Sequence, residues 1–225
     1  MSRQGRKKAG SRETQWESQG NLLTQRETMM RTLAIVAIGI ASLHVAAGPE
    51  QAPAPRPAAI RAPSLDGGTF VWPPGKGDGS ACLFFVGVDC PIANAYSPEI
   101  ARIVNEYRKR DVAFAVVYPV PDLTANEAKK HAKEYGFDCP ALLDSRLHIA
   151  RRLGATVTPE TVVLSASCEV VYRGRIDDRY TKVGGKRREN PSTRELRDAL
   201  YAQLAGKAIA SPWPRAIGCD IDFER

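Results

Sequence analysis

The chain has 225 residues, of which 43% are hydrophobic and 25% charged, and its formal net charge is +7. This composition is typical of a soluble globular protein with a real core. Residues 1–31 hold seven basic and three acidic side chains, which leaves 25 basic and 22 acidic ones in the rest of the chain. So small a surplus excludes nucleic acid as an expected partner. Five cysteines without a C-x-x-C spacing exclude a structural zinc site, and we expect no cofactor and no metal.

Residues 1–47 read as a basic leader followed by a signal peptide or an anchor. The uncharged run 33–47 follows Arg31 and ends in small residues. A positive flank, an apolar stretch of about 7–15 residues and a small-residue site are the parts of a secretory signal. Cleavage after Ala47 would release the protein on the periplasmic or extracellular side of the membrane. A retained segment would instead tether it there, although a full span needs about 20 apolar residues.

Residues 48–64 contain five prolines and are expected to form an extended linker. A folded domain is predicted over residues 65–206. The tail, 207–225, has two prolines and no clear periodicity.

Within the domain, apolar runs alternate with helical patterns. Strands are predicted at residues 69–72, 81–88, 112–118, 141–143, 161–164 and 169–173, and helices at 93–110, 124–135, 145–153 and 192–204. The capping-box pattern marks two of the helix starts, with Thr124 before Glu127 and Ser192 before Glu195. Strands that alternate with helices, followed by a hairpin and a helix, predict one α/β domain with a mixed sheet.

Cys90 is the candidate nucleophile. The strand–helix–strand unit over residues 81–118 should be a right-handed crossover with parallel strands. Cys90 then lies at the carboxyl end of a parallel strand and at the start of a helix, where active sites of open α/β sheets gather. Free backbone N–H groups and the helix dipole favour a thiolate at that position, and Pro91 fits the first helical turn.

These residues carry a family resemblance. A strand–Cys–helix segment with Pro98 eight residues after Cys90 is similar to the thioredoxin superfamily. The stretch HAKEYGFDCPALLDSRLHIARRLGATVTPETVVLS resembles the redoxin branch, which includes alkyl-hydroperoxide-reductase/thiol-specific-antioxidant proteins and exported thiol–disulfide oxidoreductases. The matching region covers about residues 64–205. In such proteins the proline of the Thr158-Pro159 pair is cis and faces the reactive cysteine.

The resemblance implies a thioredoxin-like fold, with a central mixed β-sheet flanked by helices. It also implies a thiol-dependent oxidoreductase that reduces a peroxide or a protein disulfide through Cys90, with an external thiol as reductant. Thr158 and Pro159 would complete the site around the sulfur.

Three departures leave a second hypothesis open. Ala93 stands where thioredoxin-like oxidoreductases carry their second cysteine. Leu83 and Gly87 replace the proline and hydroxyl residue that precede the peroxidatic cysteine of typical peroxiredoxins. Asp89 places a carboxylate beside the thiol, which raises a thiol pKa unless it points away. The alternative is therefore a non-catalytic binding module that presents the groove between Cys90 and Pro159 to a partner.

Cys219 in the tail could supply the missing sulfur. Attack by a second thiol on an oxidised cysteine is a standard route to a disulfide, and Gly218 would let the backbone approach closely. The other possibility is that Cys219 is free or packs as a small apolar residue.

The remaining candidates have simpler interpretations. We expect Cys82 to be buried in its strand, Cys139 to be structural and Cys168 to be exposed on a hairpin turn. The charged run 173–180 is expected to be a solvated loop with weak ion pairs. Alternatively, one of its arginines, at position 173 or 175, reaches Cys90 and stabilises its thiolate.

Overall fold

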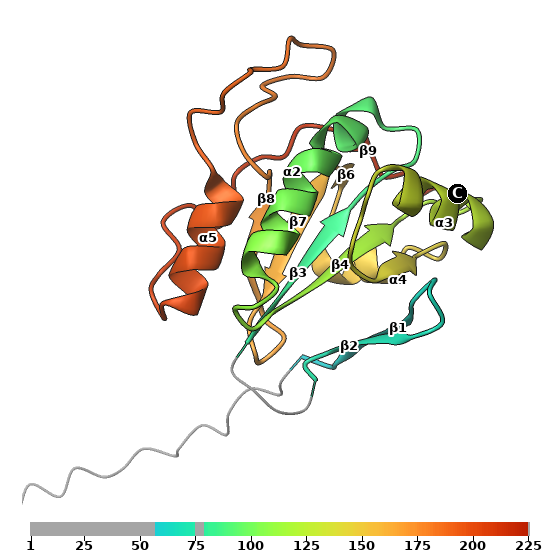
Figure 1. Ribbon diagram of the computed structural model, residues 1–225, viewed down its shortest axis with the longest axis horizontal. Helices are drawn as coiled ribbons and strands as arrows, with labels where there is room; N and C mark the ends of the chain where they lie inside the picture. Colours follow the sequence, from blue (N-terminus) through green and yellow to red (C-terminus); the bar gives the residue numbers. More distant parts are fainter. Residues whose placement is uncertain (1–56, 75–78, 225) are drawn as a thin grey trace, which may run out of the picture. The chain divides into compact units, whose positions relative to one another are not determined.

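The computed structural model describes residues 57–74 and 79–224 (Figure 1). Its strands are β1 (Ile60–Pro63), β2 (Thr69–Trp72), β3 (Ser80–Phe85), β4 (Val112–Tyr118), β5 (Ala141–Leu143), β6 (Val157–Thr158), β7 (Glu160–Leu164), β8 (Val170–Gly174) and β9 (Cys219–Asp220). Its helices are α2 (Pro91–Tyr107), α3 (Ala125–Glu134), α4 (His148–Leu153) and α5 (Glu195–Leu204). The expected leader and signal segment lie outside the described residues. Within the described ranges, no helix is long and apolar enough to cross a bilayer.

Five strands form the central sheet in the order β5-β4-β3-β7-β8. Strand β3 pairs in parallel with β4, and β4 pairs in parallel with β5. Strand β7 runs antiparallel to β3 and to β8. The prediction of an α/β fold with a central mixed sheet flanked by helices is confirmed. The parallel β3–α2–β4 crossover brings the C-terminal end of β3 to the start of α2 (Figure 1).

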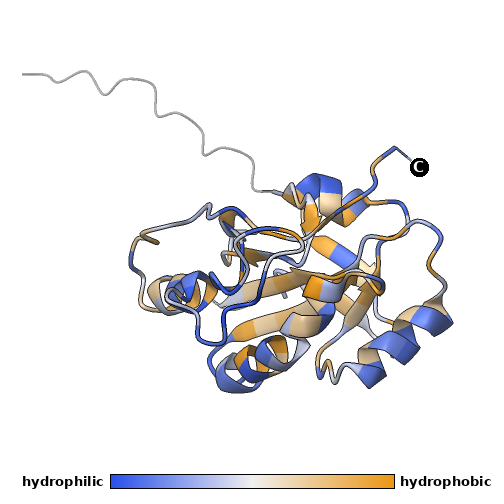
Figure 2. Cartoon of the chain, turned by 90° about the horizontal axis from the view of Figure 1, so that it is seen from above, coloured by the Kyte–Doolittle hydropathy of each residue, from blue (hydrophilic) through white to orange (hydrophobic). Residues whose placement is uncertain are grey.

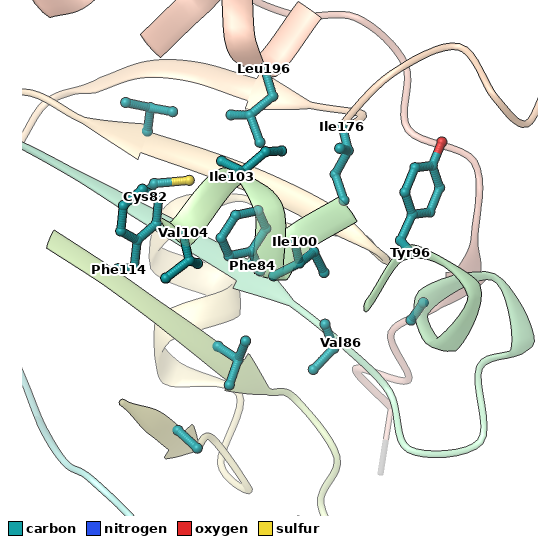
Figure 3. Close-up of a cluster of buried hydrophobic side chains, with 14 of the residues drawn as sticks. Cys82, Phe84, Val86, Tyr96, Ile100, Ile103, Val104, Phe114, Ile176 and Leu196 are labelled. Carbon is teal, nitrogen blue, oxygen red and sulfur yellow. The ribbon is translucent and has the colours of Figure 1, made fainter. Parts of the chain in front are cut away.

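Strand β3 is buried on both faces, which explains its uninterrupted apolar sequence. Successive side chains of a strand point to opposite faces of the sheet. Cys82 and Phe84 therefore join one apolar cluster with residues of α2 and α5 (Figure 3), whereas Leu83 and Phe85 join a second cluster with α4 and the β1–β2 pair. Cys82 is fully buried, as expected. Colouring by hydropathy shows apolar strands inside the domain and polar helix faces outside it (Figure 2).

Of the two predicted capping boxes, one is confirmed and one is wrong. The Thr124 hydroxyl accepts the Glu127 N–H, and the Glu127 carboxylate accepts the Thr124 N–H, which starts α3 at residue 125. Helix α5 instead begins at residue 195 without a side-chain cap. The N–H of Ser192 donates to the Asp178 carboxylate at 2.6 Å, so residue 192 is held away from the helix.

Three short strands, β1, β6 and β9, lie where the sequence predicts none. Ile60–Pro63, placed by the sequence in the Pro-rich linker, pairs antiparallel with β2. In the tail, β9 pairs antiparallel with β6. Both expectations of unpaired chain are corrected at these residues, since each segment satisfies its backbone groups by pairing.

Two expectations of exposure are also wrong. Cys168 is only 3% exposed, and its sulfur lies against the carbonyl of Trp72 in β2. The run expected to be a solvated loop is buried at Asp177, Asp178 and Arg179. The Arg179 guanidinium lies 3.1 Å from the Asp177 carboxylate and 3.7 Å from that of Glu99 on α2. Opposite charge on the inner side of α2 thus draws this segment inward.

Candidate active site

Cys90 occupies the N-cap of α2, after the turn that leaves β3. Its backbone is extended, and its Sγ accepts a hydrogen bond from the Ala93 N–H at 3.4 Å. Pro91 follows at the first helical position, where no N–H is needed. The side chain is 3% exposed. An N-cap acceptor satisfies one of the free N–H groups of the helix start, so the fold makes the sulfur a favourable place for negative charge.

The Thr158-Pro159 segment lies against this sulfur. The peptide bond between Thr158 and Pro159 is cis. When Cys90 is protonated, its thiol donates a hydrogen bond to the Thr158 carbonyl oxygen at 2.8 Å. The structure therefore brings together the cysteine and the Thr-Pro pair that the sequence assigns to one site.

Cys219 completes the site from the tail. Strand β9 pairs with β6 so that Cys219 lies opposite Thr158. The two sulfurs of Cys219 and Cys90 are 2.8 Å apart, whereas a disulfide bond is about 2.05 Å long. A Cβ at Gly218 would lie 2.1 Å from the Thr158 carbonyl oxygen, so only glycine permits this close approach. Once an oxidant removes two electrons and the thiol protons from the pair, a small closing movement would join the two sulfurs.

The pKa values of the two thiols move in opposite directions. Burial raises the pKa of Cys90, but hydrogen bonds with Cys219, the Ala93 N–H and the Thr158 side chain outweigh it, and its pKa is lowered overall. Burial, together with the hydrogen bond to Cys90, raises the pKa of Cys219 to about 12. The arrangement favours a thiolate on Cys90 with Cys219 as the S–H donor. Asp89, expected to oppose the thiolate, is exposed, and the Cys90 pKa is lowered in its presence.

The alternative in which a nearby arginine stabilises the thiolate is wrong. Arg175 forms an ion pair with Glu195 on α5. Arg173 lies 3.9 Å from the Glu160 carboxylate and over the ring of Trp213. The donors that the structure places at Cys90 are neutral, and they come from the helix start and the tail.

A cavity of about 640 Å³ opens over the two cysteines. It lies between the turn after β3, the loop after β4, helix α3 and the β9 segment. Both Cys90 and Cys219 line it, as do Thr158 and His131. Among the described residues, no group of three or more His, Cys, Asp or Glu is arranged to hold a metal ion.

A buried hydrogen-bond chain behind the cavity has no sequence signature. Tyr118 and His131 Nδ1 are 3.0 Å apart, and His131 Nε2 is 2.9 Å from Asn94 Oδ1. The Asn94 amide in turn donates to the Val88 carbonyl at 2.9 Å. These hydrogen bonds link β4, α3 and α2 to the turn that carries Cys90. Three residues on separate elements give no spacing pattern, which is why sequence reasoning misses it.

A strand–Cys–helix unit facing a Thr-Pro segment on a mixed sheet defines a thioredoxin-fold thiol protein. The Redoxin family profile matches residues 61–186, more than half of the chain, and the protein belongs to the Redoxin family.

Solved structures with this fold include an uncharacterised conserved protein from Geobacillus kaustophilus, 26% identical, with a TM-score of 0.64 over 76% of this chain and 91% of that one. A hypothetical protein from Sinorhizobium meliloti 1021 is 24% identical, with a TM-score of 0.63 over 74% and 91% of the two chains. A putative thiol:disulfide interchange protein, DsbE, from Chlorobium tepidum is 14% identical, with a TM-score of 0.51 over 65% and 94%. A comparison with curated protein sequences finds no match.

Proposed function

We propose that this protein is a thiol-dependent oxidoreductase whose working pair is Cys90 and Cys219. The observation that carries the proposal is the 2.8 Å separation of the two sulfurs, together with their opposite pKa shifts. In this pair the tail supplies the sulfur that Ala93 does not. The non-catalytic binding module was suggested by that missing sulfur, so it loses its main support.

The pair supports a two-step cycle. The Cys90 thiolate attacks a peroxide oxygen, releasing an alcohol or water and leaving a sulfenic acid, or it attacks a disulfide sulfur, releasing one thiolate and leaving a mixed disulfide. Cys219 then attacks the Cys90 sulfur, and water or the second thiol departs. The product in either case is a Cys90–Cys219 disulfide, which an external thiol returns to the dithiol.

The decisive experiment is a disulfide map combined with turnover assays. Treatment of the reduced protein with one equivalent of peroxide or of an oxidised peptide should give a Cys90–Cys219 bond. Cys90→Ser should abolish turnover of both substrates, and Cys219→Ser should stop the cycle after one equivalent. Cys139→Ser, outside the cavity, is the matched control. Retention of steady turnover by Cys90→Ser would contradict the proposal, and the more active substrate identifies the natural class.

Export is a second part of the proposal. The apolar run 33–47 after a basic flank supports a secretory signal, and disulfide chemistry suits an oxidising compartment. N-terminal sequencing of the protein recovered from fractionated cells tests this. A mature chain that begins near residue 48 in the exported fraction is the expected result, and a full-length chain confined to the cytosol is the contrary one.

A further inference from the structure

The cavity over the cysteines has an apolar interior and a charged rim. Leu123 and Ile221 are largely buried within it, and Val120 and Pro121 extend the apolar surface from the loop after β4. The rim carries exposed carboxylates from the turn before α2, from the loop after β4, from α3 and from the tail, namely Asp89, Asp122, Glu127, Glu134, Asp220 and Asp222. A groove that joins apolar side chains to a charged rim and ends at two cysteines can hold the residues that flank a cysteine in a polypeptide.

The sign of the charge at this rim is opposite to that of the whole chain. The full chain carries a net charge of +7. Against the six carboxylates, Lys130 is the one Lys or Arg that lines the cavity among the residues that the structure describes. Burial lowers the pKa of His131, so this residue adds little positive charge near neutral pH. A cleft lined by one sign of charge attracts ligands of the other sign and raises their association rate.

The two sulfurs differ in access to this groove. Cys90 is 3% exposed, whereas Cys219 is partly exposed beside the rim residue Asp220. A bulky partner therefore meets Cys219 first. When Cys219 is attacked, Cys90 is the leaving group, and its sulfur departs at the start of α2, where the Ala93 N–H and the helix favour negative charge.

We propose that this groove is the docking site for a positively charged polypeptide whose cysteine exchanges with the Cys90–Cys219 pair at Cys219. The inference rests on the proposed function and identifies the thiol partner of the same site. Apolar side chains of the partner lie along Val120, Leu123 and Ile221, and its basic side chains face the acidic rim.

The exchange balances as follows. The partner's thiolate attacks Cys219 Sγ of the oxidised protein, the Cys90–Cys219 bond breaks, and Cys90 leaves as a thiolate. A second thiolate of the partner, or of another partner molecule, attacks the partner's own sulfur in the mixed disulfide. Cys219 departs and takes up a proton. The partner's two thiols are oxidised to one disulfide, and the protein is reduced by two electrons.

The test uses the full chain with its cysteine pair oxidised and two synthetic peptides of equal length. Each peptide has one cysteine, with lysines flanking it in one and glutamates in the other. At low salt, the lysine peptide should reduce the protein about tenfold faster, and 1 M salt should remove most of that difference. Acid quenching with limiting peptide, followed by mass mapping, should find the peptide on Cys219.

Matched double variants locate the effect. In Asp89→Asn with Glu134→Gln, the ratio of the two peptide rates should fall to about threefold or less. Glu169 and Glu189 are exposed carboxylates outside the cavity. In the double variant Glu169→Gln with Glu189→Gln, the ratio of the two peptide rates should stay near tenfold. Because each variant is judged by a ratio, a general change in cysteine reactivity cancels. Cysteamine is a small cationic thiol without a peptide that could dock. Its rate of reduction therefore shows how much of the lysine peptide's advantage comes from charge alone.

The outcomes separate this inference from the proposed function. Equal rates for the two peptides, in a protein whose disulfide forms and is reduced by dithiothreitol, would overturn the docking site alone. The docking site would also be overturned if cysteamine had as large a rate advantage over the glutamate peptide as the lysine peptide has. Peptide found on Cys90 would overturn the order of attack. A protein that never forms the Cys90–Cys219 bond would overturn both proposals.

Discussion

Cys90 and Cys219 have different environments although their sulfurs nearly touch. Cys90 accepts hydrogen bonds at the start of α2, where the helix favours negative charge. Cys219 sits on a two-residue strand and donates to Cys90. When the pair loses one proton, Cys219 therefore keeps its proton and Cys90 carries the charge. This division rests on a few neutral donors, so single substitutions should change it measurably.

Removal of the Cys219 donor should raise the pKa of Cys90. In the reduced protein the rate of Cys90 alkylation by iodoacetamide should rise with pH, and the midpoint of this curve should lie below that of the denatured protein, because the pKa of Cys90 is lowered by the fold. In Cys219→Ala the same curve should shift to higher pH, since a donor to the thiolate is lost. Mass mapping assigns the label to Cys90, and Cys139→Ala should leave the curve in place. An unshifted curve in Cys219→Ala would refute the role of this hydrogen bond.

His131 should stabilise the fold as a neutral imidazole. With Nε2–H donating to Asn94 and Nδ1 accepting from Tyr118, both ring nitrogens are satisfied. His131→Phe leaves two polar partners unpaired, at a cost of about 1–3 kcal/mol, whereas His131→Gln keeps a donor and an acceptor and should cost less. Urea unfolding of the two variants at pH 7.5 measures the difference. Equal losses would show that the hydrogen bonds do not matter.

The same histidine predicts a pH dependence of stability. Burial lowers its pKa, against smaller opposing effects of Glu134 and Asp89. The unfolded chain thus binds the proton more readily, so the stabilisation is present above the unfolded pKa of about 6.5 and is lost as pH falls through the lower folded value. The unfolding free energy of the wild type should therefore drop more below pH 6.5 than that of His131→Gln. Parallel pH curves would contradict this assignment.

At the scale of elements, β9 holds Cys219 in place through a close contact that only glycine allows. In Gly218→Ala the new methyl would overlap the Thr158 carbonyl, so β9 should move away from β6 and the sulfurs should separate. We expect the Cys90–Cys219 bond to form at least tenfold more slowly. Its formation is measured by trapping the remaining free thiols after mild oxidation. Gly184→Ala is the control: unlike Gly218, Gly184 has a positive φ, so alanine there adds backbone strain, but its Cβ would meet no atom within 4 Å. Unchanged closure in Gly218→Ala would show that β9 tolerates the shift.

The elements also show how far the sequence reaches. The strand at 112–118 and the capped helix after Thr124 were predictable because periodicity and capping are local signals. Strands β1 and β9 were not, since four or two residues carry no periodicity and form only through a distant partner. The capping pattern at Ser192 was misleading because Asp178, 14 positions earlier, takes its N–H.

The candidate site divides in the same way. Its position at Cys90 and the Thr-Pro segment follows from a motif with local spacing. The contact of Cys219 with Cys90 spans 129 positions, so from sequence it could be no more than one of two alternatives. The acidic rim draws on four separate segments, and a net charge of +7 conceals it. The negative charge of the rim, opposite to that of the whole chain, is visible only when the fold has placed these segments around one cavity.

At the scale of the molecule, the tail is joined to the domain by more than the two sulfurs. The Ile221 N–H donates to the Thr156 carbonyl at 2.9 Å, and Arg151 lies over the ring of Phe223. These contacts hold Cys219 at Cys90 before any covalent bond forms. A disulfide at this point therefore ties together segments that are already adjacent, and most of its effect should fall on the unfolded chain.

The oxidised protein should accordingly be more stable than the reduced one. A cross-link between residues 129 positions apart removes chain entropy from the unfolded state, worth about 5 kcal/mol for a loop of this length. Urea unfolding should show a higher midpoint for the oxidised chain than for the chain in dithiothreitol. Cys219→Ser, which cannot form the bond, should unfold at one midpoint in both conditions. The contrary result is a wild type whose urea midpoint is the same in both conditions although mapping finds the disulfide. The bond would then strain the folded state by as much free energy as it removes from the unfolded chain's entropy. In that case the tail is not preorganised for closure.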